Sequence, residues 1–389
     1  MYLMCKKCLL HTKIPNVTLN EEGLCNACAI HEKSESDYAK RFASKKFLDL
    51  IHQLNKTSMK YNAIVMLSGG KDSMFLLDLA KNEYHLKVLA VSVFHPLMNE
   101  TARENVETIC AEREVDLVSI VVDEEEYKKI MHHGIVNRSA YQLDEFFGCY
   151  LCSNIFRWMI IQKAMEYKIP LVLDGSDKSQ TEEPYYMDAK RWVRDESFAG
   201  KPLGVFHNIV CDALGESYQS SQFNFERDSV RYYYPTIVAP LTFMEVQRDI
   251  VNKKNMNKIF TNCDAVPFFS VFSIKNYDCV PYIRHYSNEL RNGYSNILQL
   301  KTDYNFKEVL PKKVFTDILD EYKSVILFII SQIVKNGRLQ FEDREAICNM
   351  ASTYASTFGD EVCLHLLDSV MKIPDYFEYF KIDIQEAIL

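Results

Sequence analysis

A six-residue run combines glycines, hydroxyls, a lysine and a carboxylate in an order that suits phosphate chemistry. The run reads Ser68-Gly69-Gly70-Lys71-Asp72-Ser73. It follows the apolar segment 64–67 and precedes helical spacing at 74–79, so we expect it to join a strand to a helix. Glycines allow a ligand to approach the backbone closely, and the N-terminus of a helix attracts anions. The run therefore predicts a phosphate-binding loop.

This loop differs from a Walker A loop, because the chain has no G-x-x-x-x-G-K-S/T motif. Its pattern, Ser-Gly-Gly-x-Asp-Ser, resembles the signature of the PP-loop ATP pyrophosphatases, which cleave ATP between the α- and β-phosphates. The resemblance implies that backbone N–H groups and the two serine hydroxyls of residues 68–73 hold pyrophosphate, while Asp72 holds Mg²⁺. It also places adenine near Val93 and Phe94, at the end of the second predicted strand. An ordinary strand-to-helix turn is the plain alternative.

Four cysteines near the N-terminus have the spacing of zinc ligands. Cys5 and Cys8 form one C-x2-C pair, and Cys25 and Cys28 form a second. This spacing is typical of a zinc ribbon, in which two turns each offer two thiolates to one tetrahedral ion. Residues 1–35 have too few apolar side chains for a core of their own, so a bound Zn²⁺ would supply folding energy. Redox dithiols are the alternative.

The residues around these cysteines resemble the N-terminus of the N-acetyl sugar amidotransferases. They read Cys5-Lys6-Lys7-Cys8-Leu9 and Asn20-Glu21-Glu22-Gly23-Leu24-Cys25-Asn26-Ala27-Cys28, and a further similar segment is Ser287-Asn288-Glu289-Leu290-Arg291-Asn292-Gly293. Those PP-loop enzymes of surface-polysaccharide biosynthesis use ATP and ammonia to turn an acetamido group into an acetamidino group. The resemblance implies a nucleotide-linked N-acetyl sugar as substrate, with glutaminase and ammonia-channel subunits as partners.

A second set of cysteines comprises Cys149, Cys152 and Cys263, the first two just before a helix expected to begin near Ile155. The set resembles the three ligands of the 4Fe–4S cluster in the PP-loop tRNA thiolation enzymes. Three thiolates leave one iron open to bind sulfide. The resemblance implies sulfur transfer from a sulfur donor to a tRNA base or small molecule. Zinc or free thiols at the first two positions, with a core cysteine at the third, are the alternatives.

The loop after the fourth predicted strand carries further candidate contacts. Gly175 and Asp177 are expected to bind the nucleotide or substrate. Lys178, together with Lys71, could stabilise the charge that develops on the leaving pyrophosphate. The sugar amidotransferases usually have Trp-Gly-Glu-Asn at this loop, so the chain departs from their pattern here.

Short apolar segments alternate with helical patterns around these motifs. Strands are expected at 64–67, 86–93, 117–122 and 170–173, and helices at 101–112 and 155–167. This alternation predicts an α/β fold with a parallel sheet and helices on both faces, in which ligands bind beyond the carboxyl ends of the strands. The resemblance of residues 68–73 implies that this is the PP-loop form of such a sheet. We expect a zinc ribbon at 1–35, a connecting helix at 36–56, an ATP pyrophosphatase domain at 57–295 and a helical region at 296–389.

Net charge and hydrophobic segments indicate the compartment and the classes of partner to expect. The formal net charge of -8 gives the chain no global attraction for phosphate backbones, which disfavours tRNA as a partner. The N-terminus lacks the apolar segment of a signal peptide, and the longest apolar run, Val325 to Ile330, is too short to span a bilayer. The sequence thus predicts a cytoplasmic protein with no membrane partner.

Together these motifs predict an enzyme that adenylates a carbonyl or amide oxygen of its substrate, with release of pyrophosphate, and then replaces that oxygen. Amidotransfer to a nucleotide-linked N-acetyl sugar is the first interpretation, because its resemblance covers more segments. Sulfur transfer that depends on a 4Fe–4S cluster is the second. A non-catalytic, nucleotide-binding zinc-ribbon scaffold is the third, although the intact Asp72 and Ser73 argue against it.

Overall fold

The computed structural model describes residues 2–31, 45–143, 145–175, 193–194, 201–215, 230–233, 262–292, 312–358 and 367–384. The chain divides into two compact units. Unit 1 comprises Met1–Ala29, Gly134–Cys149 and Cys263–Leu389, and unit 2 comprises Ile30–His133 and Tyr150–Asn262. Neither unit is a continuous stretch of chain, because the polypeptide passes from one to the other more than once.

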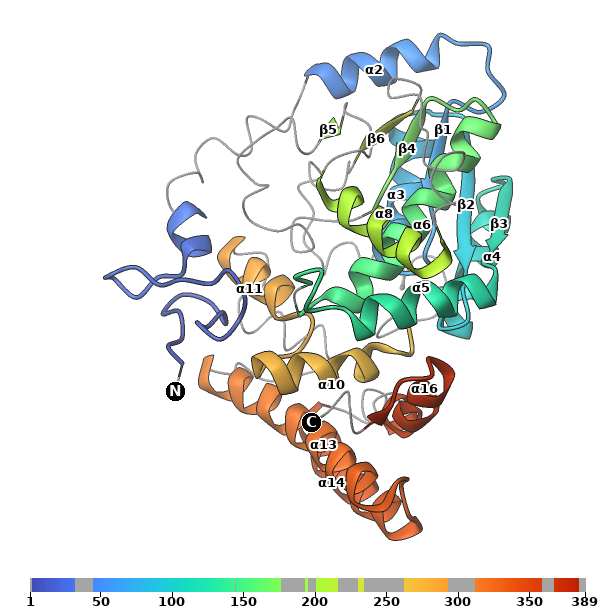
Figure 1. Ribbon diagram of the computed structural model, residues 1–389. Helices are drawn as coiled ribbons and strands as arrows, with labels where there is room; N and C mark the ends of the chain where they lie inside the picture. The colour runs from blue at the N-terminus through green and yellow to red at the C-terminus, as the bar shows by residue number, and fades with distance from the viewer. Residues whose placement is uncertain are drawn as a thin grey trace. The chain divides into compact units, whose positions relative to one another are not determined.

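Unit 2 is built on a sheet of six strands (Figure 1). They are β1 (Ala63–Met66), β2 (Val88–Phe94), β3 (Leu117–Val121), β4 (Leu171–Leu173), β5 (Val193–Arg194) and β6 (Arg231–Tyr233). Their order is β3-β2-β1-β4-β6-β5, and only β5 runs antiparallel to its neighbour. The order reverses between β1 and β4, which creates the crevice where doubly wound sheets bind ligands. The predicted α/β fold with a parallel sheet is confirmed.

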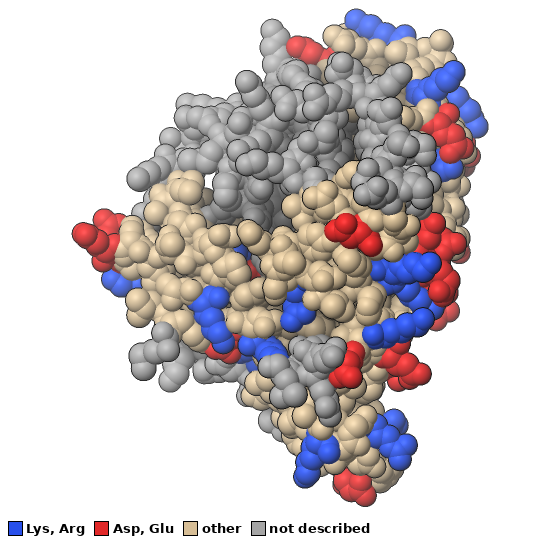
Figure 2. Space-filling model, viewed as in Figure 1, with Lys and Arg blue, Asp and Glu red and all other residues tan. Residues whose placement is uncertain are grey.

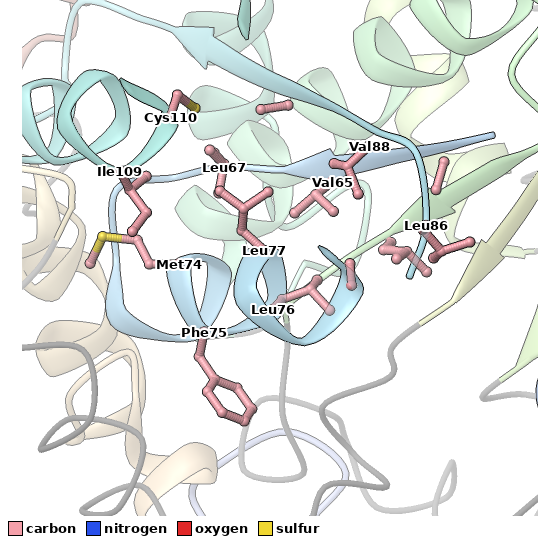
Figure 3. Packing of buried hydrophobic residues seen from close by; sticks show 14 of the residues in the cluster. Val65, Leu67, Met74, Phe75, Leu76, Leu77, Leu86, Val88, Ile109 and Cys110 are labelled. Atoms are coloured by element: carbon pink, nitrogen blue, oxygen red, sulfur yellow. The ribbon is translucent and has the colours of Figure 1, made fainter. Parts of the chain in front are cut away.

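Helices of unit 2 complete the layers on the sheet. They are α2 (Lys45–Asn55), α3 (Lys71–Asp78), α4 (Glu100–Glu112), α5 (Glu124–Val136), α6 (Phe147–Glu166) and α8 (Lys201–Leu214), with a π-helical turn at Leu79–Glu83. Residues of α2, α3 and α4 share one apolar cluster with β1, β2 and β4. Figure 3 shows Leu76 and Leu77 of α3 beneath Val65 of β1, and Ile109 of α4 next to Met74 of α3. This packing fixes the end of β1 relative to the start of α3.

The predicted strands are found within a few residues of their expected positions, but two helices differ from the prediction. Helix α6 begins at Phe147 rather than near Ile155, so Cys149 and Cys152 lie inside the helix and not before it. Helix α8 occupies part of a region in which the sequence shows little periodicity. Both cysteines therefore lie on one regular helix, which begins in unit 1 with Cys149 and continues in unit 2 with Cys152.

Helices of unit 1 pack around aromatic side chains. They are α10 (Val266–Tyr277), α11 (Ile283–Asn292), α13 (Lys312–Asn336), α14 (Phe341–Phe358) and α16 (Ile373–Tyr379). Phe268 of α10 meets Phe377 of α16 edge to face at 5.0 Å, and Phe147 meets Phe272 of α10 at 5.5 Å. Such edge-to-face pairs add to the free energy gained from burial.

The surface of the described residues mixes charges of both signs. Figure 2 shows basic and acidic side chains interspersed on the face that it draws. Lys128 lies 3.0 Å from Glu124 within α5, and Lys163 lies 2.6 Å from Glu166 within α6. Among the described residues, no helix is both long enough and apolar enough to cross a membrane.

Candidate functional site

The loop between β1 and α3 has a backbone that only glycine suits at one position. Gly69 has a φ of +74°, in the left-handed region. A Cβ atom there would lie 2.0 Å from the carbonyl oxygen of Ala102 in α4. Because both the conformation and the close approach require glycine, the loop lies directly against α4. Gly70 then precedes the first residue of α3 and has no side chain to cap it, so the helix N-terminus is left open to a ligand.

Hydrogen bonds between two serines preform this loop. The Ser68 and Ser73 hydroxyl oxygens lie 3.2 Å apart, and the Ser68 N–H donates to the Ser73 hydroxyl at 3.2 Å. The Ser73 hydroxyl donates to the carbonyl of Gly70 at 2.9 Å. The loop therefore holds its shape through its own hydrogen bonds, as a preorganised anion site should.

Two charged side chains lie at the start of α3. The ammonium group of Lys71 lies 2.5 Å from a carboxylate oxygen of Asp72, and the two side chains are 16% and 20% exposed. The carboxylate stands in the first turn of the helix, where the helix dipole stabilises negative charge. Both groups are thus accessible next to the loop, where a phosphate group and a divalent cation would each find an opposite charge.

Asn105 supports the loop from α4, and sequence reasoning missed it. Its side-chain amide is buried and donates to the carbonyl of Gly69 at 3.2 Å. An asparagine on a helix has no pattern that would identify it as a loop support. The only available signal is its position three residues after Ala102, on the same face of α4.

The loop after β4 comes close to the phosphate loop. A Cβ atom on Gly175 would lie 3.0 Å from the backbone nitrogen of Ser73. Asp174 precedes it and is held by Arg157 of α6 at 3.4 Å. The structure thus brings the predicted Gly175 to the predicted loop, where the strand order reverses between β1 and β4. Asp177 and Lys178 lie outside the described residues.

The end of β2 presents Val93 and Phe94, and then a buried histidine. His95 is 6% exposed, and its ring packs against that of Phe156 with 4.6 Å between centroids. Burial, reinforced by the charge of Arg103, lowers the pKa of His95 to about 3. In the described part of the chain, the His95 Nδ1 atom has no hydrogen-bond partner. A neutral imidazole therefore lies at the strand end where adenine is expected.

Cys152 connects this strand end to helix α6. Its sulfur lies 3.0 Å from the hydroxyl of Tyr127 and 3.8 Å from the sulfur of Met131. The ring centroid of Tyr127 is in turn 6.0 Å from that of His95. Within unit 2, a buried thiol therefore lies one side chain away from the end of β2.

Cys149 and Cys263 belong to unit 1, where Tyr282 lies near both. The sulfur of Cys149 is 3.5 Å from the Tyr282 hydroxyl, and burial raises the pKa of Cys149 to about 11. The pKa of Tyr282 is raised well above its ordinary value by burial first, then by Cys149, and to a smaller degree by Cys263. Gly148 is needed beside this cysteine, because a Cβ atom there would lie 2.4 Å from the ring of Phe269.

The four N-terminal cysteines form a compact buried group in unit 1. Their sulfurs all lie within 4.8 Å of one another, and among the described residues no other three potential metal ligands lie that close together, Cys149, Cys152 and Cys263 included. The Cys5 and Cys28 sulfurs are 3.7 Å apart, and the Cys8 and Cys25 sulfurs are 3.6 Å apart. Tetrahedral Zn–S bonds of about 2.3 Å would separate the sulfurs by about 3.8 Å. The spacing fits one tetrahedral ion.

This geometry also distinguishes a single ion from an iron–sulfur cluster. In a 4Fe–4S cluster each thiolate binds a different iron, so the four sulfurs must lie farther apart than around one ion. Backbone N–H groups support the compact arrangement, since Lys7 donates to Cys5 at 3.4 Å and Leu10 donates to Cys8 at 3.5 Å. Metal binding would require these thiols to lose their protons, and the four close thiolates would then share one cation.

The similarities to known proteins are weak or cover only part of the chain. No family model matches the chain. An uncharacterized protein of Methanocaldococcus jannaschii is 31% identical over 118 residues, which cover 30% of this chain and 42% of that protein's length. The structure of the U34-tRNA thiolase NcsA from Methanococcus maripaludis, solved with its 4Fe–4S cluster, is 16% identical with a TM-score of 0.32, covering 76% of this chain and 87% of that one. The fold assignment rests on this chain's own strand order.

Proposed function

We propose that unit 2 binds ATP at residues 68–73 and uses it to adenylate an oxygen atom of a second substrate. The observation that carries this proposal is the position of the loop. It joins β1 to α3 at the reversal of strand order, with its N–H groups at an open helix N-terminus and Gly175 beside it. Such a crevice is where doubly wound sheets bind nucleotides.

The residues at the loop suit attack on the α-phosphate of ATP. The substrate oxygen forms a bond to the α-phosphorus, the bond to the bridging oxygen between the α- and β-phosphates breaks, and pyrophosphate leaves. The loop N–H groups and the two serine hydroxyls would hold the pyrophosphate, and Lys71 would offset its charge. Asp72 would hold Mg²⁺, which supplies additional positive charge at the phosphates.

For the second step we propose that sulfur displaces AMP. This reverses the order expected from the sequence, and the position of Cys152 is the reason. Its thiol lies next to Tyr127, which packs near His95 at the end of β2. The sugar amidotransferase interpretation has no comparable support at the substrate loop, where the chain departs from that family. Amidotransfer with ammonia is retained as the alternative.

The sulfur proposal keeps the iron–sulfur cluster that the sequence resemblance implies for Cys149, Cys152 and Cys263. Helix α6 presents the first two one turn apart, at positions that share a helix face. A 4Fe–4S cluster with three protein ligands would supply an iron able to carry sulfide. The acceptor would be a tRNA base or a small molecule with a carbonyl oxygen, and a separate sulfur donor would be required.

For the four-cysteine group we propose Zn²⁺ in a structural role. All four sulfurs are buried, and four thiolates fill a tetrahedral shell, so no coordination position stays open for a substrate.

Anaerobic purification followed by metal and acid-labile sulfide analysis tests whether sulfur, and not ammonia, displaces AMP. The variants Cys149→Ala, Cys152→Ala and Cys263→Ala are compared with Cys348→Ala, an exposed cysteine of α14. We expect about four irons and one zinc per chain, with iron lost in the first three variants only. Zinc without iron in the wild type would remove the sulfur proposal. AMP formation that depends on ammonia would then establish the alternative.

A further inference from the structure

One face of helix α11 carries polar side chains that are almost fully buried. Ser287, Asn288 and Arg291 are 0%, 1% and 4% exposed. Arg291 lies four residues after Ser287 and three after Asn288, so the three side chains share one face of the helix. Burying an arginine is costly unless its charge is compensated. The charge of Arg291 therefore needs a compensating partner at this face.

This face of α11 contacts the four-cysteine group. The Nη1 atom of Arg291 lies 3.9 Å from the sulfur of Cys28, and its Nη2 atom donates a hydrogen bond to the side-chain oxygen of Asn288. The N–H of Leu9, next to Cys8, donates to the Ser287 hydroxyl at 3.3 Å. The helix thus touches both cysteine pairs or their immediate neighbours, although about 260 residues separate them in sequence.

Apolar residues extend the same contact. The cysteines share one buried cluster with Cys279, Val280 and Ile283, and Tyr286 and Leu290 of α11 pack against it. The N-terminal segment is too small to form its own core, and the segment 279–290 supplies the missing apolar area. The metal group and α11 consequently form one packed body within unit 1.

Charge explains why the helix offers an arginine at this place. One divalent ion bound by four thiolates has a net charge of about −2, because each thiolate contributes one negative charge. Groups that donate hydrogen bonds to metal ligands orient those ligands and control how tightly the metal is held.

We propose that Arg291 is a positioning residue of the metal centre. Its guanidinium group donates to the Cys28 thiolate and balances the charge of the metal–thiolate group, and Asn288 holds the guanidinium in place. Metal retention therefore depends on α11 as well as on the four ligands. This inference rests on the proposal that the group binds zinc, and it is independent of the ATP chemistry.

The test compares metal release in Arg291→Met and Arg291→Lys with release in Arg338→Met. Arg338 is exposed, two residues after the end of α13, and serves as a matched control. Zinc release into excess chelator is followed with a colorimetric dye. We expect release to be at least about 10-fold faster in Arg291→Met, intermediate in Arg291→Lys, and unchanged in the control. Equal release rates in all four proteins would overturn the proposal.

A second readout separates this role from simple packing. In the Co²⁺-substituted protein, the thiolate-to-metal charge-transfer band reports the electron density on the sulfurs. Loss of a donated hydrogen bond should shift this band to lower energy in Arg291→Met, and Arg291→Lys should restore it in part. An unshifted band together with faster release would mean that Arg291 only packs, which contradicts the proposal.

Two further outcomes remain decisive. If Arg291→Met does not fold, Asn288→Ala keeps the arginine and removes only its anchor, and we expect a smaller acceleration of zinc release. Unchanged release in that variant would overturn the proposal. A wild-type protein without zinc would overturn the zinc proposal together with this one, whereas zinc held equally by every variant would overturn only the role of Arg291.

Discussion

The phosphate loop of unit 2 and the cysteine centre of unit 1 are assembled in different ways. The loop is formed by six consecutive residues whose own hydrogen bonds preform it, with Asn105 and Gly175 adding support. The cysteine centre needs a distant helix, since its buried cluster and its arginine come from residues 279–291. A site formed by consecutive residues can keep its shape through hydrogen bonds within that segment. A site formed by distant segments depends on the packing and the bound metal that hold those segments together.

The largest expected effect separates the two sites directly. Removing the metal with a chelator should expose the backbone of residues 5–28 and 279–291 to hydrogen exchange, because structural zinc binding contributes about 10–16 kcal/mol to the folding of small zinc domains. Exchange at residues 63–73 should not change. Mass spectrometry of exchanged peptides measures both. Equal loss of protection in both regions would show that the sites are not independent.

The next effect concerns chemistry far more than stability. Asp72→Asn removes the charge that would hold Mg²⁺ but keeps the shape of the side chain. We expect AMP formation to fall at least about 100-fold, while loss of the helix-dipole interaction lowers the unfolding free energy by only about 0.3–1 kcal/mol. Asp49→Asn, on an exposed position of α2, is the control. Full activity in Asp72→Asn would contradict the proposed role of Asp72 in holding Mg²⁺.

Two glycines with nearly equal φ angles test how closely the loop at residues 68–73 packs against α4. Gly69 has a φ of +74° and Gly337 a φ of +71°, but only Gly69 faces another backbone, that of Ala102. Gly337→Ala should cost about 1–2 kcal/mol of unfolding free energy from its backbone conformation. Gly69→Ala should cost about 1–3 kcal/mol more from overpacking. Urea unfolding compares them, and equal costs would contradict the close contact with α4.

The smallest effect tests the buried histidine at the end of β2. Burial lowers the pKa of His95 from 6.5 to about 3, so the unfolded chain binds a proton that the folded chain rejects. Its contribution to stability is complete above about pH 6.5 and is lost as the pH falls toward 3, by about 1.4 kcal/mol per pH unit.

Between about pH 6.5 and pH 5 the wild type should therefore lose about 2 kcal/mol that His95→Phe does not lose. Urea unfolding at the two pH values measures the difference. His52→Phe, an exposed position of α2, should behave like the wild type. A parallel pH dependence in wild type and His95→Phe would show that His95 is not buried as a neutral group.

The sequence predicted the strand-to-helix loop at residues 68–73, four strands and the grouping of the N-terminal cysteines, because each is encoded by neighbouring residues. It misplaced the start of α6, since that helix is apolar on most sides and gives no periodic signal where Gly148 and Cys149 lie. The contacts of Asn105 with Gly69 and of Arg291 with Cys28 could not be predicted from the sequence. Both join residues far apart in sequence, and neither residue type is distinctive for its role.

The central claim is that this chain cleaves ATP between its α- and β-phosphates. Phosphorus NMR of a reaction with ATP, Mg²⁺ and a fractionated cell extract as the source of acceptor measures this directly. We predict AMP and pyrophosphate in equal amounts, dependent on the extract and absent in Asp72→Asn. If nuclease treatment abolishes the reaction, the acceptor is RNA, and if it does not, the acceptor is a small molecule. ADP and inorganic phosphate as the products would contradict the account.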